Sequence, residues 1–562
     1  MTAPPVRLRE KAAPETAPEA SEGRPGSRRP VGLPQWFGGV VGAVVIVAVW
    51  TLFAVTTFKD NGAVPTPLAV LRQFHDDGVR FYFGAVGVSL RSALLGFLWG
   101  NALAIAVALL VMLIPALDRV ATQVAVISHC MPLTAIGPIV LVVFGGRAPS
   151  IVLAGTGVFF TTLVGSLLGL KSADRGSLDL VTAYGGGRWQ RVTKVQAIAA
   201  LPAMLSALKI AAPTALLGTI IGEYLGGVDS GIGVAITAAQ QGYVVPRTWG
   251  LALACGFVAG LGYLVIGLIG RLVTPWANTA TGVGGGPGSG RGRRSAMRLI
   301  AFGQDIWALI WPMLVAVALV LLGWIVLLKG FSVPKSIGKL PSDVWIYLFT
   351  SAQAPANRSL IAGTLGTTLH DATLGYVGGL AAATVIALLF VLSTSIEQAF
   401  MPIATLLRSV PLVAITPIIT LIFQRGSVGV AVMGAIVVFF PALVTIVFGL
   451  RSVPDQTSAL VVAYGGSRLT VLHKVAIPNA LPAFFAAARI AVPGSLIGAL
   501  VAEWLSTGKG IGGVILNAIG AFAYNQVWTS IAVLTGVSLL IYTAVGVLES
   551  VVLNSAGFTG AP

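Results

Sequence analysis

The sequence predicts an all-α integral membrane protein made of two similar halves, each with six transmembrane helices. Of its 562 residues, 56% are hydrophobic and only 10% are charged, and the mean hydropathy is +0.91. This balance is too apolar for a soluble domain. Many apolar runs are long enough to cross about 30 Å of hydrocarbon as helices. The second part of the chain also repeats the first in the same order.

Twelve apolar runs carry the fold prediction. Each has roughly 20 residues or more and lacks the alternation of strands, so helices are expected rather than a barrel. Pro132 and Pro138, and likewise Pro411 and Pro417, should kink or break the third helix of each half. The expected spans lie at about 37–57, 84–115, 120–144, 149–170, 202–225, 249–269, 306–328, 360–393, 398–423, 428–450, 482–505 and 527–549.

An internal repeat divides the chain. Residues 180–202 (LVTAYGGGRWQRVTKVQAIAALP) and 460–482 (LVVAYGGSRLTVLHKVAIPNALP) share 12 of 23 positions, and further matches recur at an offset of 279 or 280. Because six is even, both halves enter the membrane with the same polarity, which predicts a parallel repeat about the membrane normal. The expected parts are a disordered tail at 1–33, a six-helix domain at 34–275, a Gly/Ser/Arg linker at 276–298 and a second six-helix domain at 299–555.

The distribution of Lys and Arg predicts the orientation. With the N-terminus inside, the tail and the inward segments 171–194, 271–298 and 451–474 hold 19 Lys and Arg, and the outward loops hold 11, so the positive-inside rule places both termini in the cytoplasm. Residues 1–33 contain no apolar core of a signal peptide, and we interpret them as a cytoplasmic tail. The net charge of +16 requires no nucleic acid, because anionic lipid headgroups are a sufficient partner.

The repeated polar segment lies between the fourth and fifth spans of each half. A simple connector between helices needs only two to eight residues, whereas each of these loops has about 25 to 30. Two equivalent cytoplasmic loops would suit a partner that is itself a symmetric dimer. The alternative is an interfacial connector that rests on lipid headgroups.

The residues of these loops resemble a known family. Gly185 and Gly465 occupy the glycine position of the EAA loop in permease subunits of ABC importers, and LRSVPLVAITPI with FFPAL in the second half is similar to the nitrate/sulfonate/taurine type. The resemblance covers both halves. It implies a short coupling helix around 179–187 and 459–467 that docks on an ATP-binding subunit. The coupling residues it implies are Asp179, Tyr184, Gly185, Gly186, Arg188 and Lys194, and Tyr464, Gly465, Gly466, Arg468 and Lys474.

The two loops depart from the family pattern in different ways. The leading Glu of the motif corresponds to Asp179 in the first half and Ala459 in the second. The second half keeps the aliphatic-Pro pair of the motif as Ile477-Pro478, whereas the first half has Ala197-Ile198 there. The two contacts with an ATPase therefore need not be equivalent. The resemblance further implies a bacterial inner-membrane location and an extracytoplasmic solute-binding protein. Related permeases serve nitrate, sulfonates, taurine and thiamine-precursor pyrimidines.

The sequence has no ATP-binding motif of its own. The segments around Lys509 and Lys339 lack the glycine and Ser/Thr positions of a phosphate-binding loop. We therefore expect a non-enzymatic transport subunit with no cofactor or metal. ATP and Mg²⁺ would be bound by a separate ATPase dimer.

Ionisable residues inside spans are costly and are candidates for the pathway. His129 aligns with Arg408, and a positive ring of the two would favour an anion; otherwise both extend toward the headgroups or pair internally. Glu223 aligns with Glu503, next to glycine-rich outward segments, where the pair could form a gate or receptor contact. Gly96 and Gly100, with Gly375 and Gly379, form repeated GxxxG motifs that favour close helix packing.

Two other functional classes fit the sequence less well. A twelve-span ion-coupled secondary transporter can also be a parallel duplication, but such carriers have little need for the duplicated loops, and Asp118-Arg119 has no repeated counterpart. A receptor or membrane enzyme would need a convergent catalytic cluster, which the sequence lacks. The sequence therefore predicts an ABC importer permease for a small solute, with an anion or a thiamine-precursor-like molecule as candidates.

Overall fold

The computed structural model describes residues 35–555 apart from 60–61, 63, 226–227, 277–297, 394–395, 398–399, 401–415, 417–418, 421 and 425. The expected tail, nearly all of the linker, and Arg408, Pro411 and Pro417 lie outside the described residues. Within the described part the regular structure is entirely helical, as the sequence predicts. The helices of the first half are α1 (Gln35–Val55), α2 (Pro67–Asp77), α3 (Val79–Leu113), α4 (Asp118–Cys130), α5 (Leu133–Phe144), α6 (Ala148–Lys171), α7 (Arg175–Ala183), α8 (Arg188–Arg191), α9 (Ala197–Tyr224), α10 (Ile232–Gln241) and α11 (Val245–Val273).

The second half repeats this order of elements. Short π-helical turns, Val192–Gln196 and Leu472–Ala476, join α8 to α9 and α19 to α20 without a break. The helices are α12 (Arg298–Gly330), α13 (Pro341–Trp345), α14 (Ala354–Leu392), α17 (Ser427–Arg451), α18 (Asp455–Ala463), α19 (Arg468–Val471), α20 (Ile477–Ala502), α21 (Gly510–Gly520) and α22 (Tyr524–Ser555).

The described helices coincide with the predicted spans except the one at 398–423. Nine are long and apolar enough to cross a membrane, and a bent pair brings the number to ten. α1, with 21 residues, coincides with the first predicted span. Most of the predicted span at 398–423 lies outside the described residues. An all-α membrane protein of about twelve spans fits this arrangement.

The third span of the first half is broken. The chain bends by 87° between Pro115–Cys130 and Leu133–Phe144, where Met131 and Pro132 leave the helical conformation. Proline cannot donate a backbone hydrogen bond and clashes with the preceding turn, so Pro132 explains the break. Pro138 lies inside α5 without ending it. The bend turns α5 away from the axis of α4.

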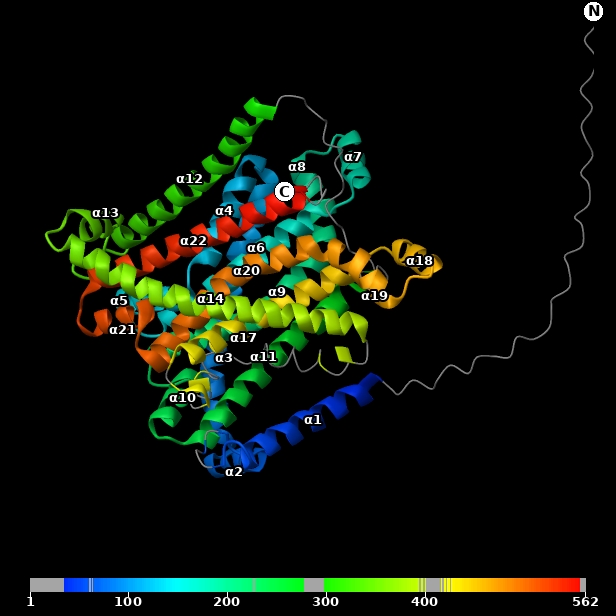
Figure 1. Ribbon diagram of the computed structural model, residues 1–562. Helices are drawn as coiled ribbons and strands as arrows, with labels where there is room; N and C mark the ends of the chain where they lie inside the picture. The colour runs from blue at the N-terminus through cyan, green and yellow to red at the C-terminus, as the bar shows by residue number, and fades with distance from the viewer. Residues whose placement is uncertain are drawn as a thin grey trace, which may run out of the picture.

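The two halves pack against each other through this broken span. α4 contacts α12, α20 and α22 of the second half, and α5 contacts α20, α21 and α22. The largest cluster of buried apolar residues contains members from both halves, including Leu216, Ile220, Met433 and Leu496. Figure 1 shows α1 and α12 on opposite edges of the bundle. The halves therefore form one body with a shared core.

The helices α7, α8, α18 and α19 lie on the right of Figure 1, and α10, α13 and α21 lie on the left. We call these sides the loop end and the opposite end. The N-terminal turns of α9 and α20 belong to the loop end, and their C-terminal turns lead toward α10 and α21. Each of these long helices thus connects the two ends.

Glycines allow close packing between the second and fourth spans of each half. A Cβ on Gly100 would lie 2.4 Å from the carbonyl oxygen of Gly155, and one on Gly379 would lie 2.6 Å from that of Ala435. Gly96 and Gly375 face backbone atoms of the same partner helices at 2.7 Å. Backbone cannot move aside as a flexible side chain can, so these positions exclude any larger residue.

Gly379→Ala should therefore destabilise the protein, whereas Gly378→Ala should not. The methyl group of alanine at position 379 would overpack the α14–α17 contact, at a cost of about 1–3 kcal/mol. Gly378 has nothing within 4 Å of its Cβ position, and alanine there gains about 0.5–1 kcal/mol of helix propensity. Thermal unfolding of both variants in detergent measures the difference, and equal melting temperatures would contradict the close-packing assignment.

Candidate functional site

The duplicated loops form the same helix-ending structure in both halves. α7 and α18 each have nine residues, and Tyr184 and Tyr464 are their C-cap residues. The next residues, Gly185 and Gly465, have φ angles of 75° and 80°, in the left-handed region that glycine adopts without strain. The predicted coupling segments at 179–187 and 459–467 thus begin inside these helices and extend past the glycines.

Backbone hydrogen bonds fix this turn. The N–H of Gly186 donates to the carbonyl of Val181 at 2.8 Å and that of Gly185 to Thr182 at 3.0 Å, which is the Schellman pattern of a helix C-terminus. Gly466 and Gly465 repeat it, both at 2.9 Å, with Val461 and Val462. A Cβ on Gly186 or Gly466 would meet the carbonyl of that valine at 2.6 or 2.7 Å. The second glycine is therefore needed for close approach and the first for its φ angle.

The loops present large side chains to solvent. Tyr184 and Tyr464 are 86% and 87% exposed, Trp189 and Leu469 are each 63% exposed, and Leu180 and Leu460 are similarly uncovered. Exposed apolar side chains gathered at one end of a molecule are typical of an interaction surface. Asp179, Arg188, Lys194, Arg468 and Lys474 are also exposed. The structure thus brings the predicted loop residues to one end of the bundle.

The two loops differ in detail. Asp174 caps α7 by accepting a 2.9 Å hydrogen bond from the backbone N–H of Ser177, and this backbone hydrogen bond holds the pKa of Asp174 below its ordinary value. The equivalent residue, Pro454, has no capping side chain. Asp179 likewise corresponds to Ala459, and the second loop carries one carboxylate, Asp455, at the position of Arg175.

A repeated ion pair joins each loop to the third span. Lys171, at the end of α6, lies 2.7 Å from Asp118 at the start of α4. In the second half Arg451, at the end of α17, pairs with Glu397. The acidic and basic partners occupy equivalent positions in the repeat. In the first half, the helix that leads into the loop is thus linked to α4, which packs against the second half.

At the opposite end, Glu223 closes a buried hydrogen-bond network. Its carboxylate accepts from the Ser89 hydroxyl at 2.7 and 2.8 Å and from the backbone N–H of Gly233 at 2.9 Å. The Ser89 oxygen in turn accepts from the N–H of Ile232 at 2.8 Å. Glu223 is 2% exposed and Ser89 is fully buried. The carboxylate therefore caps the N-terminus of α10 inside the protein.

Glu503 makes the equivalent network. It accepts from the Thr368 hydroxyl at 2.6 Å and from the N–H of Gly512 at 2.8 Å, while Thr368 accepts from the N–H of Ile511 at 2.9 Å. A Cβ on Gly510 would lie 2.1 Å from the carboxylate. The predicted gate carboxylates are thus buried helix caps, each bound to the second span of its own half.

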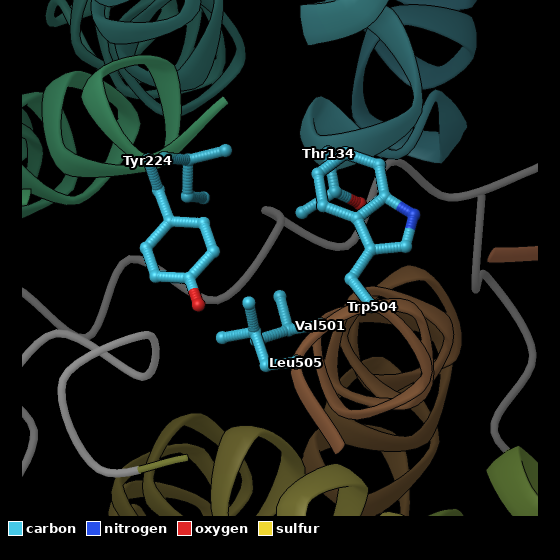
Figure 2. Close-up of a pocket in the computed structure, with 6 residues that line it drawn as sticks. Thr134, Tyr224, Val501, Trp504 and Leu505 are labelled. Carbon is cyan, nitrogen blue, oxygen red and sulfur yellow. The ribbon is translucent and has the colours of Figure 1, made fainter. Parts of the chain in front are cut away.

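The residues that follow these glutamates meet between the halves. Ile221 and Tyr224 from α9, with Val501, Trp504 and Leu505 from the second half and Thr134 from α5, line a narrow pocket. In Figure 2 the Tyr224 phenol and the Trp504 indole extend from different helices on opposite sides of the space. Ile221 and Tyr224 are the repeat equivalents of Val501 and Trp504. We call this pocket the constriction.

His129, one member of the predicted cationic pair, does not line the constriction. The ring of His129 stacks on Phe160 with centroids 4.0 Å apart, and its Nε2 has no hydrogen-bond partner within the described part of the chain. Arg408 lies outside the described residues. Lys209 and Arg489 each lie over a tyrosine ring, at 4.2 and 5.0 Å from the centroid.

A comparison with family models identifies the family to which this chain belongs. The model described as binding-protein-dependent transport system inner membrane component matches residues 100–279 and 375–553, once in each half. The chain belongs to this family. It is an ABC importer permease with two permease domains in tandem, a multi-pass membrane protein and a transport subunit rather than an enzyme.

Several relatives match less than half of the length of this permease. A "Probable ABC transporter permease protein" of Haemophilus influenzae is 30% identical over 234 residues, 42% of this chain and 93% of the relative. The "Formylaminopyrimidine transport permease protein ThiX" of Halalkalibacterium halodurans is 28% identical over 38% of the chain and 84% of the relative. A "Nitrate import permease protein NrtB" of Leptolyngbya laminosa is 27% identical over 33% and 67%.

The sequence did not indicate the constriction of this permease. Tyr224 and Trp504 are aromatic residues at the ends of apolar runs, they differ between the halves, and they belong to no sequence motif. Ser89 and Thr368 also belong to no motif. The available signal was that Tyr224 and Trp504 occupy equivalent positions in the repeat, each directly after an aligned glutamate. No group of three or more His, Cys, Asp or Glu that could hold a metal occurs among the described residues.

Thr368→Val should destabilise the permease and Thr368→Ser should not. Valine keeps the shape of threonine but leaves the buried Ile511 N–H without a partner and the Glu503 carboxyl with only the Gly512 N–H, at a cost of about 1–3 kcal/mol for the unpaired buried group. Serine keeps the hydroxyl. Thermal unfolding gives the total effect, and hydrogen exchange across residues 510–513 locates it. Unchanged exchange at Ile511 in the valine variant would show that Thr368 does not cap α21.

Proposed function

We propose that this permease forms the translocation path of an ATP-driven importer for a small solute and is coupled to a separate ATP-binding subunit dimer through its two duplicated loops. The observation that carries the proposal is the pair of matching helix-glycine turns, at one end of a pseudo-symmetric bundle, each with an exposed tyrosine. On this proposal the loop end is cytoplasmic, as are both termini. A solute-binding protein delivers the solute to the opposite end.

The chemistry of the loops supports docking to a protein. Tyr184 and Tyr464 offer broad faces with few rotatable bonds, which is typical of residues that dominate interfaces. Arg188 and Arg468 stand four residues later at the start of α8 and α19, where a guanidinium can bind carboxylates or carbonyls of a partner. The Schellman turns hold both groups in place. The missing carboxylates of the second loop imply that the two docking contacts differ.

The connections of the loops support coupling. Arg188 donates to the carbonyl of Leu113 at the end of α3, at 3.4 Å, and Gln196 donates to that of Leu170 at 3.3 Å. The Lys171–Asp118 pair continues this chain of contacts to α4, and α4 packs against the second half. ATP binding and hydrolysis would then bias two arrangements of the halves through these contacts.

The nature of the solute is open between two classes on the sequence alone. The prediction of an anionic solute such as nitrate or a sulfonate depended on a cationic ring formed by His129 and Arg408. His129 is held against Phe160, and Arg408 is not among the described residues. The names of the relatives include both nitrate and a formylaminopyrimidine. His129, Glu223 and Glu503 stay candidates for the pathway on this proposal, with the glutamates acting as anchors of its walls.

The double variant Tyr184→Ala plus Tyr464→Ala should lose its ATPase partner. Truncation removes the most exposed aromatic of each loop without altering the glycine turn. Purification of the tagged full chain from its native membrane, followed by identification of the copurifying proteins, measures this loss. We expect at least a tenfold fall in recovered ATPase.

Tyr243→Ala is the matched control. Tyr243 is 88% exposed but lies just after α10 at the opposite end, so its truncation should leave the recovered ATPase unchanged. Equal recovery from all three proteins would show that the loops do not dock the ATPase. If wild type yields no ATPase and the purified chain alone drives ion-coupled uptake into liposomes, the protein is a secondary transporter and the proposal is wrong.

A further inference from the structure

We propose that, in each half, the segment between the first and second spans lies in the headgroup layer of the membrane and binds anionic phospholipids. These segments are α2 in the first half and residues 341–350 in the second, which comprise α13 and the π-helical turn Ile346–Thr350. We call them the connectors. The inference goes beyond the proposed function, because it involves neither the ATPase nor the solute.

The connectors are equivalent elements of the repeat. Each begins with a proline, Pro67 or Pro341, and the fifth residue is Leu71 in one and Trp345 in the other. α2 follows α1 and α13 follows α12, on opposite edges of the bundle (Figure 1). Each connector therefore lies on the outside of its half, where lipid surrounds the protein.

Paired tryptophans fix the depth of each connector. Trp50 stacks on Trp249 of the sixth span with centroids 5.2 Å apart, and its Nε1 donates at 2.9 Å to the carbonyl of Pro65, just before α2. The second half repeats the stack at 5.1 Å and the hydrogen bond at 2.9 Å with Trp324, Trp528 and Ile337. Tryptophan is enriched where the hydrocarbon meets the headgroups. The start of each connector is thus bound to residues typical of that layer.

Each connector exposes apolar side chains on one face. Leu68 and Leu71 of α2, and Trp345, Ile346 and Phe349 of the second connector, are all at least half exposed. Spacings of three and four residues place them on one side of a helix. The rings of Trp345 and Phe349 contact each other, with centroids 4.4 Å apart. Such faces are unfavourable in water, whereas the interfacial layer accommodates them.

The apolar face of α2 continues onto the spans that flank it in the chain. Val79 and Phe83 in the first turns of α3 are exposed, and so are Leu52 and Phe53 near the end of α1. Exposed apolar side chains on a membrane span face lipid. The same lipid therefore reaches the connector, and a soluble protein that docked there would have to displace it.

The carboxyl groups of the connectors are largely engaged within the protein. Asp77 binds Arg247 of α11, and Asp343 accepts a hydrogen bond from the N–H of Leu340 at 2.8 Å. Asp76 is the exposed carboxylate of the first connector. The exposed charge on these segments is therefore mainly positive.

Cations gather around both connectors. Of the 11 Lys and Arg that the predicted orientation places outward, three lie in or beside the first connector and four around the second, whereas the other four outward loops carry one each. Outward loops normally hold few cations, so their concentration at equivalent places indicates an anionic partner. All except Lys339 are exposed: Lys59, Arg72 and Arg80, and Lys329, Lys335, Lys339 and Arg358.

Hydrogen bonds hold two of these cations over the second connector. Arg358 Nη1 donates to the carbonyl of Leu348 at 2.8 Å, and Lys339 Nζ donates to that of Lys335 at 2.8 Å. The guanidinium keeps further donors, which suit the oxygens of a phosphate group. An anionic phospholipid offers its phosphate to the cations and its acyl chains to the apolar face. It is the partner that matches both features of the connectors.

The test adds dioleoyl phosphatidylglycerol, or zwitterionic dioleoyl phosphatidylcholine, to the purified full chain in neutral detergent and measures thermal unfolding. We expect phosphatidylglycerol to raise the melting temperature at a midpoint concentration at least tenfold below that of phosphatidylcholine. The combined variant Arg72→Gln, Arg80→Gln, Lys329→Gln and Lys335→Gln should raise the phosphatidylglycerol midpoint at least tenfold, because each cation near a membrane surface strengthens binding about fivefold.

Two variants serve as controls. Arg72→Lys, Arg80→Lys, Lys329→Arg and Lys335→Arg together keep the charge and should change the midpoint less than twofold. Arg147→Gln plus Lys509→Gln removes two exposed cations from the same end outside the connectors and should have as little effect. Equal midpoints for the two lipids, or equal weakening in the variant that keeps the charge, would overturn the proposal.

A depth measurement does not depend on the stability of the fourfold variant. Cys130 and Cys255 are buried, so a spin label attaches to an exposed cysteine introduced as Leu71→Cys or Trp345→Cys. In phosphatidylglycerol vesicles that contain no other protein, we expect oxygen dissolved in the bilayer to relax these labels at least threefold more than a water-soluble nickel complex does. Asp229→Cys, an exposed position between α9 and α10, should show the reverse. Labels at 71 and 345 that nickel reaches freely would overturn the proposal and assign the connectors to a protein partner.

Discussion

The structure depends on the requirement that every backbone N–H and C=O inside the membrane finds a partner in the protein, because hydrocarbon offers none. Long helices satisfy this requirement over most of the chain. Wherever a helix is interrupted, free backbone groups must be paired by other means. The N-termini of α10 and α21 are such places, and the carboxylates of Glu223 and Glu503 with the hydroxyls of Ser89 and Thr368 provide the partners. The ionisable residues within these spans are therefore part of the backbone pairing.

Hydropathy and the internal repeat were sufficient to predict the fold. Long apolar runs have few structural alternatives in a membrane, and the duplicated order fixes two halves of equal polarity. The glycine turn of the loops was also predictable, because Gly185 and Gly465 have the φ angles that glycine alone adopts easily. The break at Pro132 followed from the chemistry of proline. In these cases local chemistry and the larger fold agree.

The pathway could not be predicted in the same way. The sequence indicated charged residues such as His129, because charge in a membrane is costly. The structure places its ring against Phe160. The residues that line the constriction are ordinary apolar and aromatic side chains, and only the bend at Met131–Pro132, which brings Thr134 beside the ends of the long helices, shows that they meet. A contact between distant segments leaves no local pattern.

The duplication has left the two halves unequal where they meet other molecules. At the opposite end, Arg247 binds Asp77 between α11 and α2. Burial raises the pKa of Asp77, but hydrogen bonds from Arg247, Gln73 and Tyr82 outweigh it and hold the pKa below its ordinary value. The equivalent of Arg247 is Gln526, so the second half has no such ion pair. The loops differ in their carboxylates, and the constriction pairs a phenol with an indole.

The docking loops and the constriction are the two ends of the same helices. One continuous helical segment runs from Arg188 to Tyr224 and its equivalent from Arg468 to Thr507, with 37 and 40 residues, so each extends over about 55–60 Å at 1.5 Å per residue. Pro202 and Pro213, and likewise Pro482 and Pro493, interrupt the hydrogen bonding inside these segments. Prolines and π-helical turns are the positions at which such a segment bends most readily. On the proposed function, a tilt of the loops would reach Tyr224 and Trp504 along these segments and would link docking of the ATPase to the width of the constriction.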